Sequence, residues 1–429
     1  MKDHELLELE SRKSFDFFWN ETNTDINSKG YGLIRDRAHG VHDSSNSSCN
    51  GRLSGQMGCV LCTDICSIAS VGFGLSALPI GVERGWISRK EGFERAARTL
   101  NTLLHHADQV NGFFYHFLCM KTAKRARKSE VSIIDTAILL CGSIVAGEYF
   151  GGSVWETAQL LYERTAWNWY RDDRNNRFYM GYIPEQGFSG WWDFYAEQLM
   201  TYILGAGSPT YPVPGNMFYD FACYSTNDDK KGFVYSWFGS LFTHQFSHAW
   251  VDFRGKKDLR GVDWWENSVR ASLENRAYCI RMSKTFKTLH EKSWGLTPCD
   301  GPFGYQGRYG SEPSALLNRM HIVDGTVPPA GAAGSIVFTP NESLEAMEYY
   351  YNNHPKLWGR YGFVDAYNVD VLPNWYASDV IGINKGITLL MIENFRTGLI
   401  WDLFMKNRWV KKGINAVGLE DYVSKADIA

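Results

Sequence analysis

A recurring alternation of helical segments and loops constrains this chain more than any other feature of its sequence. The predicted helices are about 12 to 20 residues long, and the loops between them are rich in glycine, aspartate and aromatic residues. Residues 5–20 begin the series, with Leu6, Leu9 and Phe15 spaced to form one apolar face. Residues 60–78 are apolar on nearly every side, which predicts a helix that is buried all round.

Local signals mark the starts of two further helices. Ser88 and Glu91 have the spacing of a capping box and predict a helix over 88–107. Pro340 and Glu342 suit the first turn of another helix. Further helices are expected at about 130–148, 153–170, 190–204, 239–252, 263–286 and 378–394, and short strands near 112–118, 177–183 and 334–338.

About ten to twelve helices with few strands and no linker leave three usual architectures: an α/α toroid, a solenoid or a large bundle. The absence of a fixed-period repeat weighs against a solenoid. In a toroid the inner-helix ends and their loops converge on one mouth, where polar and aromatic loops would line a cleft. We therefore expect one all-α domain over residues 1–429.

Composition narrows the possible partners. A formal net charge of -3 offers no basic surface for nucleic acid. Aromatic residues make up 15% of the chain, and many stand beside glycine and polar residues, as in Gly190-Trp191-Trp192-Asp193. Packing accounts for most of these rings, but flat rings beside hydrogen-bonding groups also suit sugars. An oligosaccharide is the expected partner, and we expect a monomer.

Targeting signals are few. The charged N-terminus lacks the apolar core of a signal peptide, and no apolar run reaches the roughly 20 residues that span a bilayer. We therefore expect no membrane association. The protein is expected to be periplasmic or secreted if a signal was trimmed, and cytoplasmic otherwise. Nine cysteines without a disulfide-framework spacing weakly favour a reducing compartment.

The segment 187–212 holds the first candidate catalytic residue. Glu197 lies near a predicted helix start, in an aromatic surround that includes Trp191, Trp192 and Tyr195. Apolar surroundings raise the pKa of a carboxyl group because they penalise its charged form, as a general acid near neutral pH requires. An ordinary first-turn glutamate, favoured by the helix dipole, explains the residue equally well.

A second acidic candidate is Asp135, which falls just inside an apolar helical run. A buried carboxylate without a partner is costly, so Asp135 should face a partner or a cavity. Ser129 or Ser132 can cap this helix, and Glu130 stands just before it. A buried capping role for Asp135 or Ser132 is the structural alternative.

Two groups resemble metal sites without matching one. His244, His248 and Asp252 are each four residues apart, a spacing that places them on one helical face. Without a nearby glutamate base this is a weak zinc signal, and hydrogen-bonded or sugar-contacting histidines are favoured. Three cysteines also share a helical period in an apolar stretch, and small buried cysteines explain them better than a metal. They are Cys59, Cys62 and Cys66.

The C-terminal third adds loops that set Asp or Asn beside aromatic residues and glycines. They lie at 294–305, 361–368 and 378–386, and their order fits no nucleophile elbow, phosphate loop or dinucleotide fingerprint. We expect no cofactor and no metal. Two separated carboxyl groups are the chemistry that remains, and glycoside hydrolysis is its commonest use.

Seven segments, in order along nearly the whole chain, resemble the glucoamylase-like family, glycoside hydrolase family 144, the bacterial endo-β-1,2-glucanases. The segments are SIASVGFGLSALPIGVERGWISRKE, EVSIIDTAILLCG, YAEQLMTYILGAGSPTYP, LFTHQFSHAWVDFRG, WGLTPCDGPFGY, YGFVDAYN and MIENFRTGLIW. The resemblance implies an (α/α)6 toroid and hydrolysis of β-1,2-linked glucan with inversion at the anomeric carbon. A related module in cyclic β-1,2-glucan synthases performs transglycosylation.

Carried over by resemblance, the family's Y-x-E segment places the general acid on Glu197, and its Ser-x-x-Asp-Thr-Ala segment falls on Asp135. The family's Ile-Asp-Gln-Gly sequence corresponds here to 383–386, with Asn384 in place of the aspartate. Asparagine cannot accept a proton as aspartate can, which leaves Asp379, Asp135 or Asp365 as the general base. Phe-Tyr-Ala-Glu in place of Tyr-Asn-Glu, and Thr-Pro in place of Thr-Ala, are further departures that put linkage and chain-length preference in doubt.

The predicted site combines these candidates. Glu197, Asp135 and Asp379 are expected to be catalytic. The expected substrate-binding residues are Glu130, Trp191, Trp192, Tyr195, His244, Gln245, His248, Asp300, Tyr305, Asp365, Tyr367, Asn368 and Asn384. Three alternatives stay open: an exo-acting or differently linked glucosidase or transglycosylase on the same fold, a non-catalytic oligosaccharide-binding relative, and a metal-dependent cyclase using His244 and His248.

Overall fold

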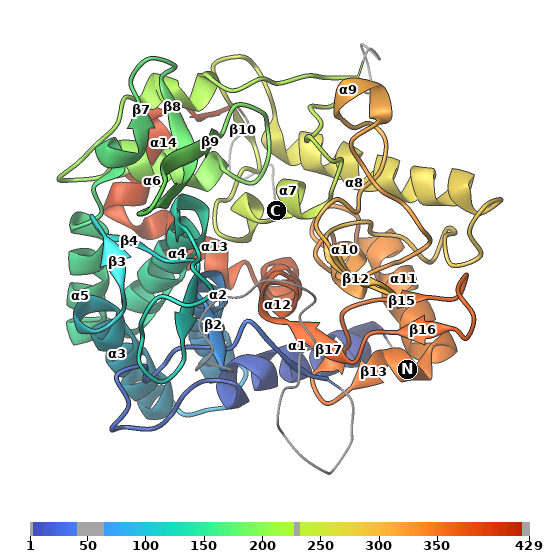
Figure 1. Cartoon of the computed structure of the whole chain (residues 1–429), viewed down its shortest axis with the longest axis horizontal. Coiled ribbons are helices and arrows are strands. Elements are labelled where there is room, and N and C mark those ends of the chain that lie inside the picture. Colours follow the sequence, from blue (N-terminus) through green and yellow to red (C-terminus); the bar gives the residue numbers. More distant parts are fainter. Residues whose placement is uncertain (1–2, 41–63, 227–231, 423–429) are drawn as a thin grey trace.

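A ring of inner helices forms the centre of the protein. The computed structural model describes residues 3–40, 64–226 and 232–422. The inner segments, in ring order, are α2 (Ile68–Glu83), α4 (Ile133–Phe150), α6 (Leu199–Gly207), α7 (Phe242–Gln245) with the 3-10 helix η3 (Ser247–Ala249), α10 (Pro329–Ala333) and α12 (Gly382–Arg396). Helix α2 packs on α4, α4 on α6, α10 on α12 and α12 on α2, while hydrogen bonds join α6 to η3 and α7 to α10, which closes the ring (Figure 1).

Outer helices cover this ring and complete an (α/α)6 toroid. They are α1 (Asp3–Asn20), α3 (Arg89–His105), α5 (Gly152–Glu163), α8 (Trp264–Met282), α11 (Pro340–Asn353), α13 (Leu399–Lys406) and α14 (Arg408–Ala416). The remaining short helices are α9 (Ala315–Asn318), η1 (Trp167–Tyr170), η2 (Gly215–Tyr219) and η4 (Pro355–Leu357). The outer helices bury one face each, as amphipathic sequences do, whereas residues 68–81 of α2 are all buried.

Close backbone contact between α2 and α4 depends on two glycines. A Cβ atom added to Gly142 would lie 1.9 Å from the carbonyl oxygen of Gly72. Any larger residue at either position would push the two inner helices apart. Across the ring, Trp250 Nε1 donates a hydrogen bond of 2.9 Å to Ser76 Oγ, and Asn394 Nδ2 donates one to the Ala249 carbonyl.

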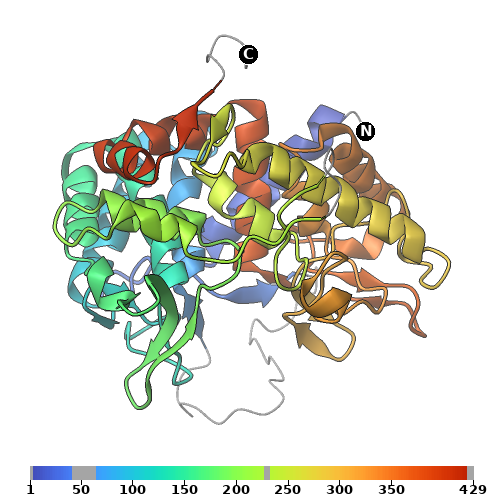
Figure 2. The ribbon, with the colours of Figure 1, turned by 90° about the horizontal axis from the view of Figure 1, so that it is seen from above.

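Short strands stand directly before three inner helices. β2 (Ile65–Ser67) leads into α2, β6 (Val131–Ser132) into α4 and β17 (Asp379–Ile381) into α12, and β1 (Arg37–His39) pairs antiparallel with β17. In Figure 2 the blue strand β1 lies toward the lower side of the molecule, and the start of α1 and the red strand near the C-terminus lie at the upper side. The inner-helix N-termini therefore share one mouth.

The other strands are β3 (Gln109–Val110), β4 (Phe113–Phe114), β5 (Phe117–Cys119), β7 (Arg171–Asp172), β8 (Arg177–Ile183), β9 (Gly187–Trp191), β10 (Lys256–Lys257), β11 (Cys299–Gly301), β12 (Gly304–Gln306), β13 (Trp358–Gly359), β14 (Gly362–Phe363), β15 (Tyr367–Asn368), β16 (Trp375–Tyr376) and β18 (Glu420–Asp421).

Several predicted elements are confirmed. The capping box of Ser88 and Glu91 starts α3, and β8 has the predicted bounds. Three predictions are wrong. The expected strand at 334–338 is a turn, the helix expected from 190 begins only at Leu199, and 239–252 is broken into α7 and η3.

The helix α4 is the one described helix that is long and apolar enough to cross a membrane by length and composition. In this structure 83% of it is buried among the other helices, as expected of an inner helix of the toroid. Cys66 is buried, in line with the sequence interpretation, while Cys59 and Cys62 lie outside the described residues.

Candidate active site

Glu197 lies in the turn that precedes α6, at the mouth of the toroid. Gln198 holds this turn from both sides, because its Oε1 accepts a hydrogen bond from the Ala196 N–H and its Nε2 donates one to the Phe194 carbonyl. From the neighbouring inner segment, Ser247 Oγ donates a hydrogen bond of 2.6 Å to the Glu197 carbonyl. The position of Glu197 is therefore fixed by two inner segments of the ring.

The surroundings of Glu197 favour its protonated form. Burial raises the pKa of Glu197 to about 7, and the negative charge of Asp135 adds to the shift. The side chain is still partly exposed to solvent. A carboxyl group that holds its proton near neutral pH and reaches solvent can act as a general acid. Glu197 precedes α6, whose first residue is Leu199, and so does not stand in the first turn of the helix.

Asp135 and Glu130 share one histidine. His116 Nδ1 lies 2.9 Å from Glu130 Oε1, and its Nε2 lies 3.6 Å from Asp135 Oδ1. Ser132, the cap of α4, donates a hydrogen bond of 2.5 Å to Asp135 Oδ2 and accepts one from the Asp135 N–H. The His116 ring also stacks on Phe117, with the ring centroids 3.9 Å apart. Asp135 thus faces a charged partner, as the sequence predicts.

These contacts favour the protonated form of His116. Burial alone would lower the pKa of His116, but Asp135 and Glu130 outweigh it and raise the pKa to about 9. In turn His116 lowers the pKa of Glu130 despite burial, whereas burial keeps the pKa of Asp135 raised. The three side chains are close enough to hold a metal ion. A protonated imidazole has no free lone pair for a metal, so a proton-bridged cluster fits these residues better.

A second charged cluster surrounds Arg37 on the β1–β17 ladder. Arg37 Nη1 donates hydrogen bonds of 3.1 and 3.2 Å to the carboxylate of Asp300 and lies 3.6 Å from Asp379 Oδ2. Asp379 also lies 3.4 Å from His39 Nδ1. Burial opposes the charge of Arg37, but the surrounding carboxylates raise the pKa of its guanidinium above the ordinary value. Asp36 joins the two clusters, because its charge raises the pKa of both His116 and Asp300.

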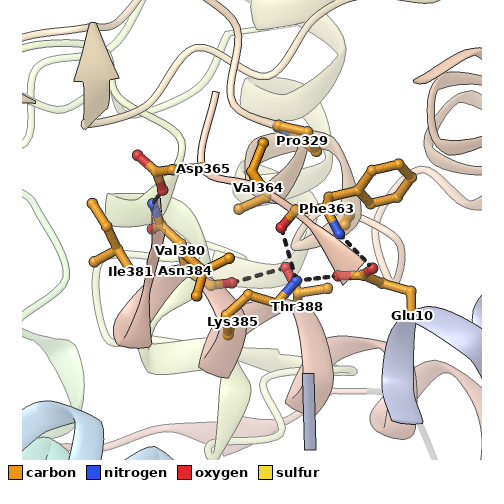
Figure 3. A pocket seen from close by; sticks show the side chains of 12 residues that line it. Glu10, Pro329, Phe363, Val364, Asp365, Val380, Ile381, Asn384, Lys385 and Thr388 are labelled. Atoms are coloured by element: carbon orange, nitrogen blue, oxygen red, sulfur yellow. Dashed lines mark hydrogen bonds and ion pairs between the residues drawn. The ribbon is translucent and has the colours of Figure 1, made fainter. Parts of the chain in front are cut away.

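Asp365 lies behind this cluster, between β14 and β15, where it contacts the first turn of α12. Its Oδ2 accepts a hydrogen bond of 2.7 Å from the Asp300 N–H, and its Oδ1 accepts one of 2.8 Å from Asn384 Nδ2 (Figure 3). Burial and the charge of Asp300 raise the pKa of Asp365 well above its usual range. Both oxygens are therefore engaged inside the protein, which leaves Asp365 less open to a reacting water than Asp135 or Asp379.

The structure does not place several predicted substrate contacts at the mouth, because their side chains are buried within the protein. Tyr195 stacks on Trp264, and its hydroxyl lies 3.2 Å from His244 Nδ1. Gln245 donates to the Gly331 carbonyl and thereby joins α7 to α10. The predicted contacts that lie in the interior are Trp192, Tyr195, His244, Gln245, His248, Asp365, Tyr367, Asn368 and Asn384.

His244 and His248 are both buried in the core, and each has its own hydrogen-bond partner. His244 contacts Tyr195, while His248 on η3 lies 2.9 Å from Ser268 Oγ. Burial lowers the pKa of both histidines to about 3. Their different partners and helical segments argue against the shared zinc site that the spacing allowed.

Two predicted aromatic contacts are accessible. Trp191 is 45% exposed on β9, where its Nε1 donates to Asp172 Oδ2. Tyr305 on β12 is 52% exposed, and it lies near enough to Asp365 for the charge of that carboxylate to raise the pKa of the Tyr305 hydroxyl. Of the two, Tyr305 is the one that the structure brings to the carboxylate clusters.

His116, Arg37 and Asp36 were not predicted from the sequence. His116 lies in an expected strand and Arg37 near a loop, and neither belongs to a local motif. The carboxylates of Glu130 and Asp135 could have signalled a nearby cation, but only the fold identifies which one.

Together the residues form an acid held protonated near neutral pH beside carboxylates that are balanced by His116 and Arg37. Such a pair can protonate a leaving oxygen and activate a water.

The chain is similar in sequence and in structure to several known proteins. A family model described as "Putative glucoamylase" matches residues 190–408. The structure of an endo-β-1,2-glucanase from Chitinophaga pinensis, solved as a complex with sophorotriose and glucose, has a TM-score of 0.82 and 28% identity, and the match covers 98% of this chain and 99% of that one. A "putative glucoamylase" from Bacteroides uniformis has a TM-score of 0.83 and 30% identity, with 98% of both chains covered.

A curated relative from Parabacteroides distasonis carries the name exo β-1,2-glucooligosaccharide sophorohydrolase (non-reducing end). It is 28% identical over 461 residues, covering 97% of this chain. This chain spans only 58% of the length of that relative. The resemblance of the sequence motifs is confirmed, and the chain belongs to the glucoamylase-like family, glycoside hydrolase family 144.

Proposed function

We propose that the protein is an inverting glycoside hydrolase that acts on β-1,2-glucan or its oligosaccharides, with Glu197 as general acid. The observation that carries the proposal is the Glu197 carboxyl group, with a pKa of about 7, at the mouth beside Asp135. The names of the Chitinophaga and Parabacteroides relatives support the substrate.

In this mechanism Glu197 donates its proton to the leaving glycosidic oxygen. An ionised aspartate activates a water that attacks the anomeric carbon from the opposite face. Inversion requires the two carboxyl groups to stand roughly 6.5–9.5 Å apart, so that the water fits between them and the sugar.

Asp135 and Asp379 are the two candidates for the general base. Their side chains are 12% and 24% exposed, so a water can reach either one. Asp379 lies beside Arg37, a contact that stabilises a carboxylate. Asp135 is the one whose charge acts on Glu197, as expected for two groups that face one substrate.

A leaving-group experiment tests the assignment. Glu197→Gln should lose turnover on β-1,2-glucan but keep much of it on a nitrophenyl β-sophoroside, because a good leaving group needs little protonation. The general-base variant, Asp135→Asn or Asp379→Asn, should lose turnover on both substrates. Asp193→Asn, an exposed position in the same loop as Glu197, is the matched control. Near-normal glucan turnover by Glu197→Gln contradicts the assignment, and anomeric NMR of the first product checks inversion.

Exo action is the second candidate, because the curated relative is named as an exo enzyme. A single disaccharide released from the earliest time point would support exo action. A ladder of intermediate lengths would support endo cleavage. Other linear glucans in the same assay test the linkage.

A further inference from the structure

A pocket of about 720 Å³ lies beside the Arg37 cluster. One side is the β11–β12 turn with Phe303, and the other is the segment 371–378, which includes β16. Pockets of about 300–1,000 Å³ are typical of ligand sites. The pocket therefore has room for more than one sugar ring.

The pocket presents aromatic rings that are anchored from behind. Trp375 packs against a small buried cluster that includes Tyr309. The Tyr376 hydroxyl lies 3.0 Å from His354 Nδ1, and the Trp358 ring meets Phe363 edge-on with the centroids 5.0 Å apart. Rings that are held in place lose little side-chain entropy when a ligand binds.

Two apolar side chains in this pocket have almost no protein contact. Phe303 is 94% exposed and Leu372 is 93% exposed. Exposed apolar groups gathered at a pocket mark a binding surface. Among the other lining residues are Lys356, Asn374 and Ser378, which offer an ammonium, an amide and a hydroxyl. Aromatic faces for C–H groups, with polar groups for hydroxyls, match the surface of a pyranose.

The pocket adjoins the candidate active site. Ser378 lines the pocket and donates a hydrogen bond of 3.2 Å to Asp379 Oδ1. On the opposite wall, Phe303 follows β11, the strand that carries Asp300. The pocket and the carboxylates of Asp300 and Asp379 are therefore built on the same two segments of the chain.

We infer that this pocket binds the part of the glucan chain that is remote from the bond being cleaved. This role rests on the proposed function and adds to that function a preference for long glucan chains. A long glucan fills both the mouth and the pocket, whereas a short oligosaccharide fills the mouth alone.

The test compares two substrates on the whole protein. For Phe303→Ala and Trp375→Ala, the ratio of kcat/KM on long linear β-1,2-glucan to kcat/KM on sophorotriose should fall about three- to ten-fold, the size of one lost stacking contact. Phe303 is exposed, so its substitution leaves the core intact even if Trp375→Ala destabilises the fold. Leu160→Ala, an exposed apolar position on α5, is the control and should leave the ratio unchanged.

Calorimetric binding of long linear glucans of several linkages to Glu197→Gln, with and without Phe303→Ala, separates the two proposals. Binding that depends on Phe303, without hydrolysis of any glucan by the unsubstituted protein, supports the pocket and contradicts the proposed function. Hydrolysis of β-1,2-glucan with the same ratio of kcat/KM values in Phe303→Ala, Trp375→Ala and the unsubstituted protein supports the proposed function and contradicts a glucan-binding role for the pocket. If the protein self-associates and Phe303→Asp abolishes this without changing glucan binding, the pocket is a contact between copies of the chain. That result also contradicts a glucan-binding role for the pocket.

Discussion

Asn384 donates a hydrogen bond of 2.8 Å from its side-chain amide to the buried carboxylate of Asp365. A second donor, the Asp300 N–H, holds the other oxygen of the same carboxylate. An aspartate at position 384, the residue expected from the resemblance, would bring two acids into contact there. The asparagine therefore acts as a donor that stabilises Asp365, and the general base must be sought elsewhere.

Asn384→Asp should destabilise the protein in a pH-dependent way. The two carboxyl groups would share one proton, which raises the pKa of the pair in the folded protein above its unfolded value. Stability is then retained at low pH and lost as pH rises through the folded pKa. We expect the melting temperature to fall more at pH 8 than at pH 5, with a loss of about 1–3 kcal/mol at the higher pH.

The matched control for this substitution is Asn101→Asp, on the exposed side of α3, which should change stability little at either pH. A loss of stability in Asn384→Asp that is the same at both pH values would contradict the shared-proton explanation.

The raised pKa of Glu197 predicts the alkaline side of the pH–rate profile. Because the acid must be protonated, kcat/KM on β-1,2-glucan should decline as pH rises through about 7. Glu197→Gln should remove this limb and reduce kcat about 10²- to 10⁴-fold. Asp135→Asn removes a charge that raises the pKa of Glu197, so the limb of any residual activity should move to lower pH. A limb that keeps its position in both variants would assign it to another group.

The fold was largely predictable because helix signals are local. The capping box at Ser88 and the apolar run of α2 each reside in a few neighbouring residues. The helix expected from residue 190 failed for the opposite reason. Strand β9 forms there because it pairs with β8, and that tertiary pairing leaves no trace in the helical spacing.

The candidate site was predictable only in part. Glu197 and Asp135 stand in recognisable segments, and the structure brings them close enough to interact. The cations of the site come from elsewhere: His116, which contacts Asp135, lies between β4 and β5, and Arg37, which contacts Asp379, lies on a strand paired with β17. Tyr195, His244 and His248 were misplaced, because a polar or aromatic residue on an inner segment looks the same in sequence whether it faces the mouth or the core.

His116→Gln should reduce stability most at mildly acidic pH. The folded pKa of His116, about 9, lies above its ordinary value of 6.5. Its contribution is therefore fully present below the ordinary value and is lost as pH rises through about 9. We expect a deficit of about 1–3 kcal/mol at pH 6 that vanishes near pH 10, measured by chemical denaturation. The exposed His106→Gln should show no such trend, and a deficit that persists at pH 10 would mean that packing, not charge, is lost.

The buried ion pair between Glu10 and Lys385 ties outer helix α1 to inner helix α12, next to Asn384 (Figure 3). Lys385 Nζ lies 2.5 Å from Glu10 Oε1 and donates to the Phe363 carbonyl, while the Phe363 N–H donates to Glu10 Oε2. Burial raises the pKa of Glu10 even with this partner. Lys385→Met would leave an uncompensated acid in the core, at a loss of about 3–5 kcal/mol.

Since the folded pKa of Glu10 would then rise further above its unfolded value, the Lys385→Met defect should be smallest at low pH and grow with pH. The double variant Lys385→Met/Glu10→Gln should recover much of the stability, because the remaining neutral amide still accepts from Phe363. Denaturation midpoints across pH test both expectations, with the exposed Lys411→Met as control. If the double variant is no more stable than Lys385→Met, the pair matters through the methylene packing of Lys385 and not through its charge.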